Sequence, residues 1–336
     1  MNTWKDIRTL TGRLALLGLL VIVLWVASIF VAVNMPRKYW EYWRRNTNIM
    51  LGVGQRGGSS MIRFHEIEKY HDVDVVFIGS SHSYRSFDPR IFDSLGLQTF
   101  NMGSRNQNLV NSYYLLKDHL HKLNPRLLLI EVYWDILGGT GLESYFDLAE
   151  NYPSNLTLVE MLWGLRDIRA ADALLARWLE VNRPPYAATA VNLMPKDRYV
   201  GRGYVEKDPS YDDSIRVSPY RDAINRSQLR YLADMIKMAK DQGAKVALVV
   251  QPLPGKRLAA LQNREEVTRR MQTFAKSHDV PYLDFNELMN LRDDSLFFDS
   301  NHLTQHGVEL FDHELIRQLN KLNLLPVDGR IVSDTK

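Results

Sequence analysis

Serines and a histidine stand together directly after an apolar run in the first third of the chain. The run is Val73–Ile78, it is rich in β-branched residues, and it ends at Gly79, where a chain can turn sharply. Ser80, Ser81 and His82 follow at once. A buried strand that delivers hydroxyl groups into a tight turn places them where open α/β folds carry reactive groups. A serine hydroxyl is a weak nucleophile by itself, so this stretch needs a base from elsewhere in the chain.

A base and a partner for it stand near the other end of the chain. Asp299 and His302 are three residues apart in the segment Phe297–Gly307, just before a helix that Thr304 is expected to cap. The spacing predicts that both side chains face the edge of the sheet where the strands end. A histidine base needs a partner that fixes its tautomer. Ser81, His302 and Asp299 therefore have the residue types of a nucleophile, a base and an orienting carboxylate.

The same segment has a second interpretation as a metal site. His302 and His306 are four residues apart, with Asp299 nearby. The glutamate of the His-Glu-x-x-His pattern is absent, and the sequence offers no evident further ligand. We therefore favour the nucleophile and its base, and we expect no metal and no cofactor.

Strand and helix patterns alternate from residue 73 onward, which predicts an α/β fold: a parallel sheet with helices on both faces. After the strand that ends at Gly79, the expected strands are Leu97–Asn101, Arg126–Trp134, Lys245–Gln251 and Pro281–Phe285, and the expected helices are Asn111–Leu123, 221–242 and Arg257–Ser277.

Residues 138–220 interrupt this alternation. The insert begins with an apolar helical part, Leu158–Leu179, and continues into an irregular part rich in Tyr, Pro and Gly. Aromatic side chains on irregular backbone can stack on sugar rings, or they can pack a lid onto its own domain, which is the commoner arrangement. The tyrosines concerned are Tyr186, Tyr199, Tyr204, Tyr211 and Tyr220.

An uncharged apolar segment near the N-terminus predicts a transmembrane helix. Leu14–Val33 is twenty residues long, about the ~20 residues that cross a hydrocarbon core. A buried core helix and a cleaved signal peptide are the alternatives. Basic residues flank both ends, so charge favours neither orientation. The predicted organisation is a short tail at 1–13, the transmembrane helix at 14–35, a juxtamembrane linker at 36–70, the α/β domain at 71–325 with its insert at 138–220, and a tail at 326–336.

The predicted linker carries two further patterns. Two tyrosines and two tryptophans lie between pairs of basic residues over 37–45, which suits a membrane–water interface; an amphipathic helix packed on the domain is the alternative. Gly52, Gly54 and Gly57 match the G-x-G-x-x-G pattern of dinucleotide loops, but no convincing strand precedes them. We interpret that stretch as a flexible linker.

Charge and composition exclude several functions. The net charge of +3 arises from residues 1–45, which carry seven Lys and Arg against two Asp and Glu, and the other 291 residues sum to −2. No basic cluster follows residue 45, so we expect no nucleic-acid partner. The absence of cysteine excludes disulfides, thiolate metal sites and a cysteine nucleophile.

Three motifs resemble those of the SGNH (GDSL-like) hydrolase superfamily. Gly79-Ser80-Ser81 matches its Gly-Asp-Ser turn, Asn101-Met102-Gly103 its second block, and Asp299-Ser300-Asn301-His302 its terminal Asp-x-x-His. Within the superfamily, the chain is similar to membrane-anchored envelope proteins related to the D-alanine transfer protein of lipoteichoic acid and to alginate O-acetylation proteins. The resemblance runs over residues 73–320 without the insert. It implies a three-layer, flavodoxin-like sheet.

The resemblance also implies roles for individual residues. Ser81 would be the nucleophile, His302 the general base and Asp299 its orienting partner. The backbone N–H groups of Ser81 and Gly103 would form the oxyanion hole. The third block departs from the family, because its usual asparagine is missing after the third strand, and Asn106 is a candidate substitute donor.

Two more residues near the turn are candidates for substrate binding. His82 lies beside the nucleophile, and Arg85 could hold an anionic polymer or pair with Asp88, of which we favour the pair. Ser80 and Ser83 are interpreted as turn-forming residues.

The expected function follows from the resemblance and from the predicted anchor. It is a membrane-anchored serine esterase or O-acyltransferase that acts outside the cytoplasm on an O-acylated envelope polysaccharide or a teichoic-acid-like polymer. The bilayer, this polymer and a multi-pass membrane O-acyltransferase are the expected partners. The alternative is a catalytically weak accessory or polymer-binding protein of an envelope acylation system.

Overall fold

Five parallel strands form one sheet in the order β2-β1-β3-β6-β7, which confirms the predicted α/β class and its flavodoxin-like strand order. The strands are β1 (Val75–Ile78), β2 (Thr99–Asn101), β3 (Leu127–Glu131), β6 (Lys245–Val250) and β7 (Tyr282–Asp284). The computed structural model describes residues 3–36, 39, 56–182, 197–207, 217–289, 291 and 293–326.

Helices cover both faces of this sheet because its strands are apolar on both sides. In β1, Val76 and Ile78 belong to one buried cluster, and Val75 and Phe77 belong to the other. The first cluster lies under α6 (Leu109–Leu123), α12 (Arg226–Asp241) and α14 (Arg264–Ser277). The second lies under α16 (Gln305–Lys321), with Phe311 and Leu315 at its centre. The chain thus forms three layers.

Short helices follow the strands and complete the domain. They are α4 (Ser81–Ser86), α5 (Pro89–Asp93), α7 (Trp134–Gly138), α13 (Gly255–Ala260), α15 (Phe285–Leu288) and the 3₁₀ turn η2 (Asp294–Leu296).

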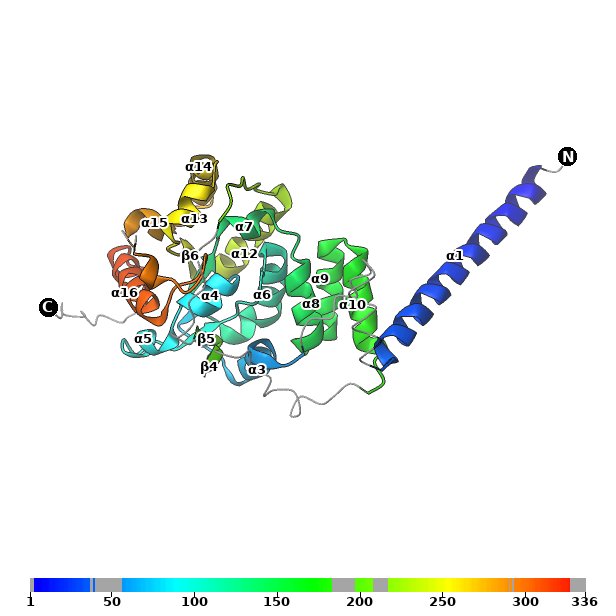
Figure 1. The fold of residues 1–336 in the computed structure, drawn as a ribbon, viewed down its shortest axis with the longest axis horizontal. Coiled ribbons are helices and arrows are strands. Elements are labelled where there is room, and N and C mark those ends of the chain that lie inside the picture. Colours follow the sequence, from blue (N-terminus) through cyan, green and yellow to red (C-terminus); the bar gives the residue numbers. More distant parts are fainter. Residues whose placement is uncertain are drawn as a thin grey trace.

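The insert begins with a helical part and continues into a hairpin. Its helices are α8 (Leu142–Asn151), α9 (Asn155–Leu165) and α10 (Ile168–Leu179), which lie between the sheet and the N-terminal helix (Figure 1). The predicted helical part Leu158–Leu179 consists of two helices, because the left-handed backbone of Arg166 ends α9 before Asp167 caps α10. The hairpin pairs β4 (Asp197–Gly201) with β5 (Tyr204–Lys207).

Three tyrosines of the insert pack onto the domain instead of facing outward as a sugar platform. The Tyr199 hydroxyl donates to Glu66, the Tyr204 hydroxyl donates to Gln305 at 2.7 Å, and the Tyr220 hydroxyl accepts the Trp134 indole N–H at 3.0 Å. Tyr186 and Tyr211 lie outside the described residues.

The prediction of a linker over residues 36–70 is wrong for its second half. Helix α3 (Gly58–Glu66) and the turn η1 (Ile67–Lys69) occupy that range, and Phe64 is fully buried in the core. The buried Arg63 side chain donates to the carbonyl of Gly203, so α3 is also bonded to the hairpin. Most of the aromatic and basic cluster at 37–45 and most of the glycine pattern lie outside the described residues.

The N-terminal helix α1 (Thr3–Asn34) extends away from the domain (Figure 1). It begins well before Leu14, so most of the predicted tail at 1–13 is helical. Its stretch Asp6–Asn34 is long and apolar enough to be a membrane span or a signal anchor.

Candidate active site

The turn after β1 presents Ser81 at the start of a helix. Ser80 caps α4, and its hydroxyl accepts the His82 N–H at 3.2 Å. Ser81 is the first residue of α4, so its own N–H stands outside the intrahelical ladder, and its side chain is partly exposed. Ser83 is a structural residue here, because its hydroxyl donates to the Asn101 side chain at 3.0 Å. The turn therefore offers one of its serines to the solvent side.

The structure brings Ser81, His302 and Asp299 together across 221 residues of sequence. His302 Nε2 lies 2.8 Å from the Ser81 Oγ, and His302 Nδ1 lies 2.8 Å from one Asp299 oxygen and 3.0 Å from the other. A carboxylate can only accept, so the Nδ1–H donates to Asp299 and Nε2 is left to accept the Ser81 hydroxyl. The arrangement is that of a nucleophile, a base and an orienting carboxylate.

Asp299 is held in its ionised form. Burial acts to raise its pKa, but the hydrogen bond and charge of His302, together with the N–H groups of Asn301 and His302, lower it to about 2. These two backbone N–H groups donate to the same Asp299 oxygen at 2.7 and 2.8 Å. The loop that carries the base is thus folded around the carboxylate, and Thr304 caps α16 directly after it, as predicted.

Aromatic rings fix the plane of the His302 imidazole. The Phe298 ring stacks on it with centroids 5.5 Å apart and planes 9° apart. The His82 ring lies 5.1 Å away on a tilted plane and stacks in turn on Tyr133 at 4.2 Å. Burial lowers the pKa of His82 well below its usual value, and the nearby His302 lowers it further, so His82 is neutral. His82 is buried and contacts the ring of His302, so its position supports the base, and the substrate-binding role predicted for it stays a prediction.

A buried acidic residue that the sequence analysis did not single out, Glu131, holds the Ser80–Ser81 turn in place through hydrogen bonds. Glu131 ends β3 and is fully buried; its two oxygens accept the N–H groups of Ser80 at 2.6 Å and Tyr133 at 2.7 Å. A Cβ at Gly79 would lie 2.4 Å from one of these oxygens, which explains a glycine there. Burial raises the pKa of Glu131 to about 7 against the two N–H bonds. An acidic residue closing an otherwise apolar strand was the available signal.

The predicted oxyanion donors other than Ser81 have different partners. The Gly103 N–H donates to the Asn101 side-chain oxygen at 2.9 Å. Asn106 is exposed, with a left-handed backbone at φ 46°, and its amide donates to Glu143. Gly103 does lie against the turn, since a Cβ there would be 2.9 Å from the Ser80 carbonyl oxygen. Of the three predicted oxyanion donors, Gly103 and Asn106 thus donate to other side chains. The Ser81 N–H is at the start of α4 and has no acceptor within that helix.

The expected Arg85–Asp88 pair is not formed. Arg85 instead pairs with Asp197 of the hairpin at 2.9 Å, and Asp88 pairs with Arg90 at 2.6 Å. Asp88 caps α5, which directs its carboxylate toward the N–H of Arg90 and away from α4. The ion pair with Asp197 and burial hold the guanidinium of Arg85 in place, so this side chain joins the hairpin to α4.

The alternative metal site is not assembled around His302. His306 is exposed and its Nδ1 lies 3.8 Å from Glu309 on the same helix. Within the described part of the chain, no three His, Asp or Glu side chains are grouped to hold a metal ion.

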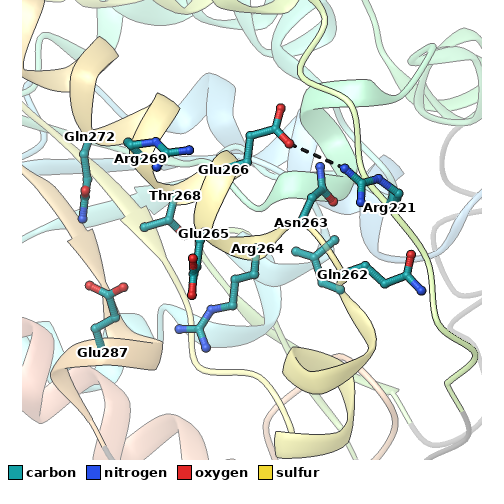
Figure 2. Close-up of a pocket in the computed structure, with 11 residues that line it drawn as sticks. Arg221, Gln262, Asn263, Arg264, Glu265, Glu266, Thr268, Arg269, Gln272 and Glu287 are labelled. Carbon is teal, nitrogen blue, oxygen red and sulfur yellow. Dashed lines mark ion pairs between the residues drawn. The ribbon is translucent and has the colours of Figure 1, made fainter.

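A surface hollow of about 760 Å³ lies elsewhere, along α14. Arg221 and Glu266 form an ion pair of 3.7 Å there, and neither residue belongs to the predicted site (Figure 2). The rest of its lining is of mixed charge and contains none of the predicted site residues.

Comparison with known proteins gives structural neighbours only. No family model and no curated protein matches the chain. Similar solved structures are acylhydrolases and esterases of the SGNH or GDSL type. A putative acylhydrolase from Bacteroides fragilis is 14% identical, with 79% of this chain and 97% of that one covered and a TM-score of 0.41. A GDSL-like lipase from Bacteroides thetaiotaomicron is 14% identical, with 79% and 98% covered and a TM-score of 0.42. An acetylxylan esterase from Geobacillus stearothermophilus, solved as a catalytic mutant, is 11% identical, with 80% and 99% covered and a TM-score of 0.38. At these levels the likeness carries no argument about activity, which rests on the geometry above.

Proposed function

We propose that this protein is a membrane-anchored serine esterase or O-acyltransferase that acts on an O-acylated polymer of the cell envelope. The observation that carries the proposal is the relay from Ser81 through His302 to an ionised Asp299, with both hydrogen bonds at 2.8 Å. This arrangement activates a hydroxyl for attack on an acyl carbonyl. The polymer and the anchor are inferred from the resemblance to envelope acylation proteins and from α1.

The reaction proceeds in two steps. The Ser81 Oγ forms a bond to the acyl carbonyl carbon while its proton passes to His302 Nε2. The tetrahedral intermediate then collapses, the bond to the polymer oxygen breaks, and His302 returns the proton to that leaving oxygen. The product is an acyl-enzyme. Asp299 accepts from Nδ1 throughout and stabilises the positive charge that His302 carries while each tetrahedral intermediate exists.

The second step decides between hydrolysis and transfer. Water or a sugar hydroxyl attacks the acyl-enzyme carbonyl while His302 removes the proton of the attacking group. The bond to the Ser81 Oγ then breaks, and His302 returns the proton to that oxygen. Transfer requires that the acceptor excludes water from the site. For transfer onto the polymer, a multi-pass membrane O-acyltransferase is the proposed acyl-donating partner, on the strength of the family resemblance, and the leaving group of the first step then belongs to the donor instead of the polymer.

The test uses the full chain in detergent with a serine-reactive fluorophosphonate probe and a chromogenic acetyl ester. We expect labelling and turnover in the parent protein and neither in Ser81→Ala. Ser83→Ala is the control, because its hydroxyl donates to Asn101 and does not contact the base. A parent protein that neither labels nor turns over would refute the enzyme.

The second candidate is an accessory protein that binds the polymer without efficient catalysis. The observation that favours it is the bond from the Gly103 N–H to Asn101, which removes a predicted oxyanion donor. Such a protein would show no probe labelling even with Ser81 present, which separates it from the enzyme in the same assay, and it would bind the polymer equally well in the parent form and in Ser81→Ala.

The proposed location is the membrane, with the domain outside the cytoplasm. The length and apolar composition of Asp6–Asn34 support the anchor. A reporter fused after Lys336 tests the orientation. If a reporter that works only in the cytoplasm is active there, the domain lies inside the cytoplasm and the proposed orientation is wrong.

A further inference from the structure

The last part of α1 packs on the insert instead of standing free. Ile29 is buried against Ala176 of α10, with Trp25 and Val33 beside them. The Trp25 indole N–H donates to Asp172 at 2.7 Å. The order of these contacts is the same along both helices, so α1 and α10 lie side by side and run in the same direction.

Hydrogen bonds fix the C-terminal end of α1 to the end of α10. The Asn34 amide donates to the Leu179 carbonyl and accepts the Val181 N–H, both at 2.9 Å. The residues from Trp25 to Asn34 are therefore attached to α10 by apolar packing and by polar bonds.

This packing leaves α1 too short to cross a bilayer unless α10 is partly immersed with it. The uncharged run is Leu14–Val33, and only Leu14–Leu24 precedes the packed part. Eleven residues span about 16 Å at 1.5 Å per residue, roughly half of the ~30 Å hydrocarbon core. Arg13 ends the run on the other side. The missing length is supplied by the segment that lies against α10.

Part of the surface of α9 and α10 is apolar, as such immersion requires. Large apolar side chains are exposed on α9 and just after α10: Trp163 is 75% exposed, Leu156 71% and Val181 70%. Ile168 and Trp178 are exposed as well. Tryptophans with aliphatic neighbours are typical of the membrane–water interface.

We propose that the surface formed by Leu156, Trp163, Ile168, Trp178 and Val181 lies in the membrane interface and is a second membrane contact besides α1. The inference rests on the proposed anchor, because the length argument holds only if α1 crosses the bilayer. Figure 1 shows α8, α9 and α10 between α1 and the sheet, so this contact sets how the catalytic domain is held over the membrane.

The absence of cysteine makes a direct test simple, because one introduced cysteine carries one label. Full-length Trp163→Cys, Leu17→Cys and Leu310→Cys are labelled with an environment-sensitive fluorophore and reconstituted into vesicles of phosphatidylcholine and phosphatidylglycerol. All three positions are exposed, so the labels disturb no packing, and Leu310 lies on α16 in the catalytic domain. Lipids with spin labels at shallow or deep positions then quench the fluorescence.

We expect quenching at position 17, which lies three residues inside the uncharged run, quenching at 163 by shallow spin labels, and none at 310. Quenching at 17 with none at 163 overturns this inference and leaves the anchor intact, as it would if a protein partner covered the surface. No quenching at 17 refutes the anchor and the inference together. Neither result depends on enzyme activity, so the catalytic proposal is tested separately. Ile168→Cys repeats the test on α10 and excludes an effect peculiar to position 163.

Discussion

Ser81 has two sets of predicted partners, the groups that activate its hydroxyl on one side and the groups that stabilise the oxyanion on the other, and only the first set is fully assembled. On one side, His302 and Asp299 form a continuous relay in which each hydrogen-bonding group has its partner in place. On the other side, the Gly103 N–H donates to Asn101, and the Asn106 amide donates to Glu143. The base is therefore assembled, while the predicted stabilisation of the oxyanion rests on the Ser81 N–H alone.

The difference follows from what each side is built of. The relay needs one short loop, in which the Asp299 carboxylate accepts the N–H groups of its own next residues and so fixes His302 three positions on. An oxyanion hole needs backbone N–H groups from separate strands, and each N–H also has a structural acceptor within reach. The relay is a local feature, whereas the oxyanion side depends on how several elements meet.

The largest expected effect is at the base. Because Nε2 of His302 is the acceptor for the Ser81 proton, His302→Ala should lower kcat for an acetyl ester on the order of 10⁴–10⁶-fold. The control is His306→Ala, whose exposed side chain faces Glu309 and whose activity should match the parent. An equal loss in both variants would instead favour the metal interpretation of this histidine pair.

A smaller effect is expected where the turn is braced. Glu131→Gln places an amide NH₂ against one of the two N–H donors, so the Ser80–Ser81 turn shifts. We expect kcat and the rate of fluorophosphonate labelling to fall roughly ten- to a hundredfold, with KM nearly unchanged. Glu160→Gln, at a surface pair with Lys117, is the matched control. An unchanged labelling rate would show that Glu131 has only a structural role.

The same variant tests the sign of a pH effect on stability. The pKa of Glu131 is raised from 4.5 to about 7 by burial, so between these values the folded chain keeps a proton that the unfolded chain has lost. The unfolding free energy of the parent therefore falls as pH rises through this window, by roughly 3 kcal/mol for this group. Glu131→Gln lacks this decline, so thermal unfolding of the two proteins from pH 4.5 to 7.5 should show the parent losing stability relative to the variant. A constant difference would contradict the raised pKa.

The parts of the fold that the sequence predicts correctly are those that short, local residue patterns determine. The five strands are short runs of apolar residues between turn-forming ones, and their order along the chain follows from the alternation with helices. The relay was predictable for a similar reason, because Asp299 and His302 are close in sequence and Ser81 directly follows a strand.

Contacts between distant segments were not predictable in this way. Arg85 has an acidic residue three positions away, but the capping of α5 engages Asp88 and the insert brings Asp197 instead. The sequence predicts a linker where α3 stands because the apolar face of this helix is completed only by packing against the insert and the core. Glu131 has no local partner in sequence, since the turn it braces comes 51 residues earlier.

The smallest expected effect distinguishes the two sides most sharply. Asn106→Gly removes the amide without strain, because glycine adopts the left-handed backbone at φ 46° freely. With the amide engaged by Glu143 at an exposed position, we expect kcat/KM for the acetyl ester to change less than about twofold, whereas loss of an oxyanion donor costs on the order of 10²–10³. A loss of that size, at an unchanged melting temperature, would mean that Asn106 leaves Glu143 and turns to the oxyanion during the reaction. The relay and the oxyanion side would then be equally complete, and the accessory-protein alternative would lose the observation that favours it.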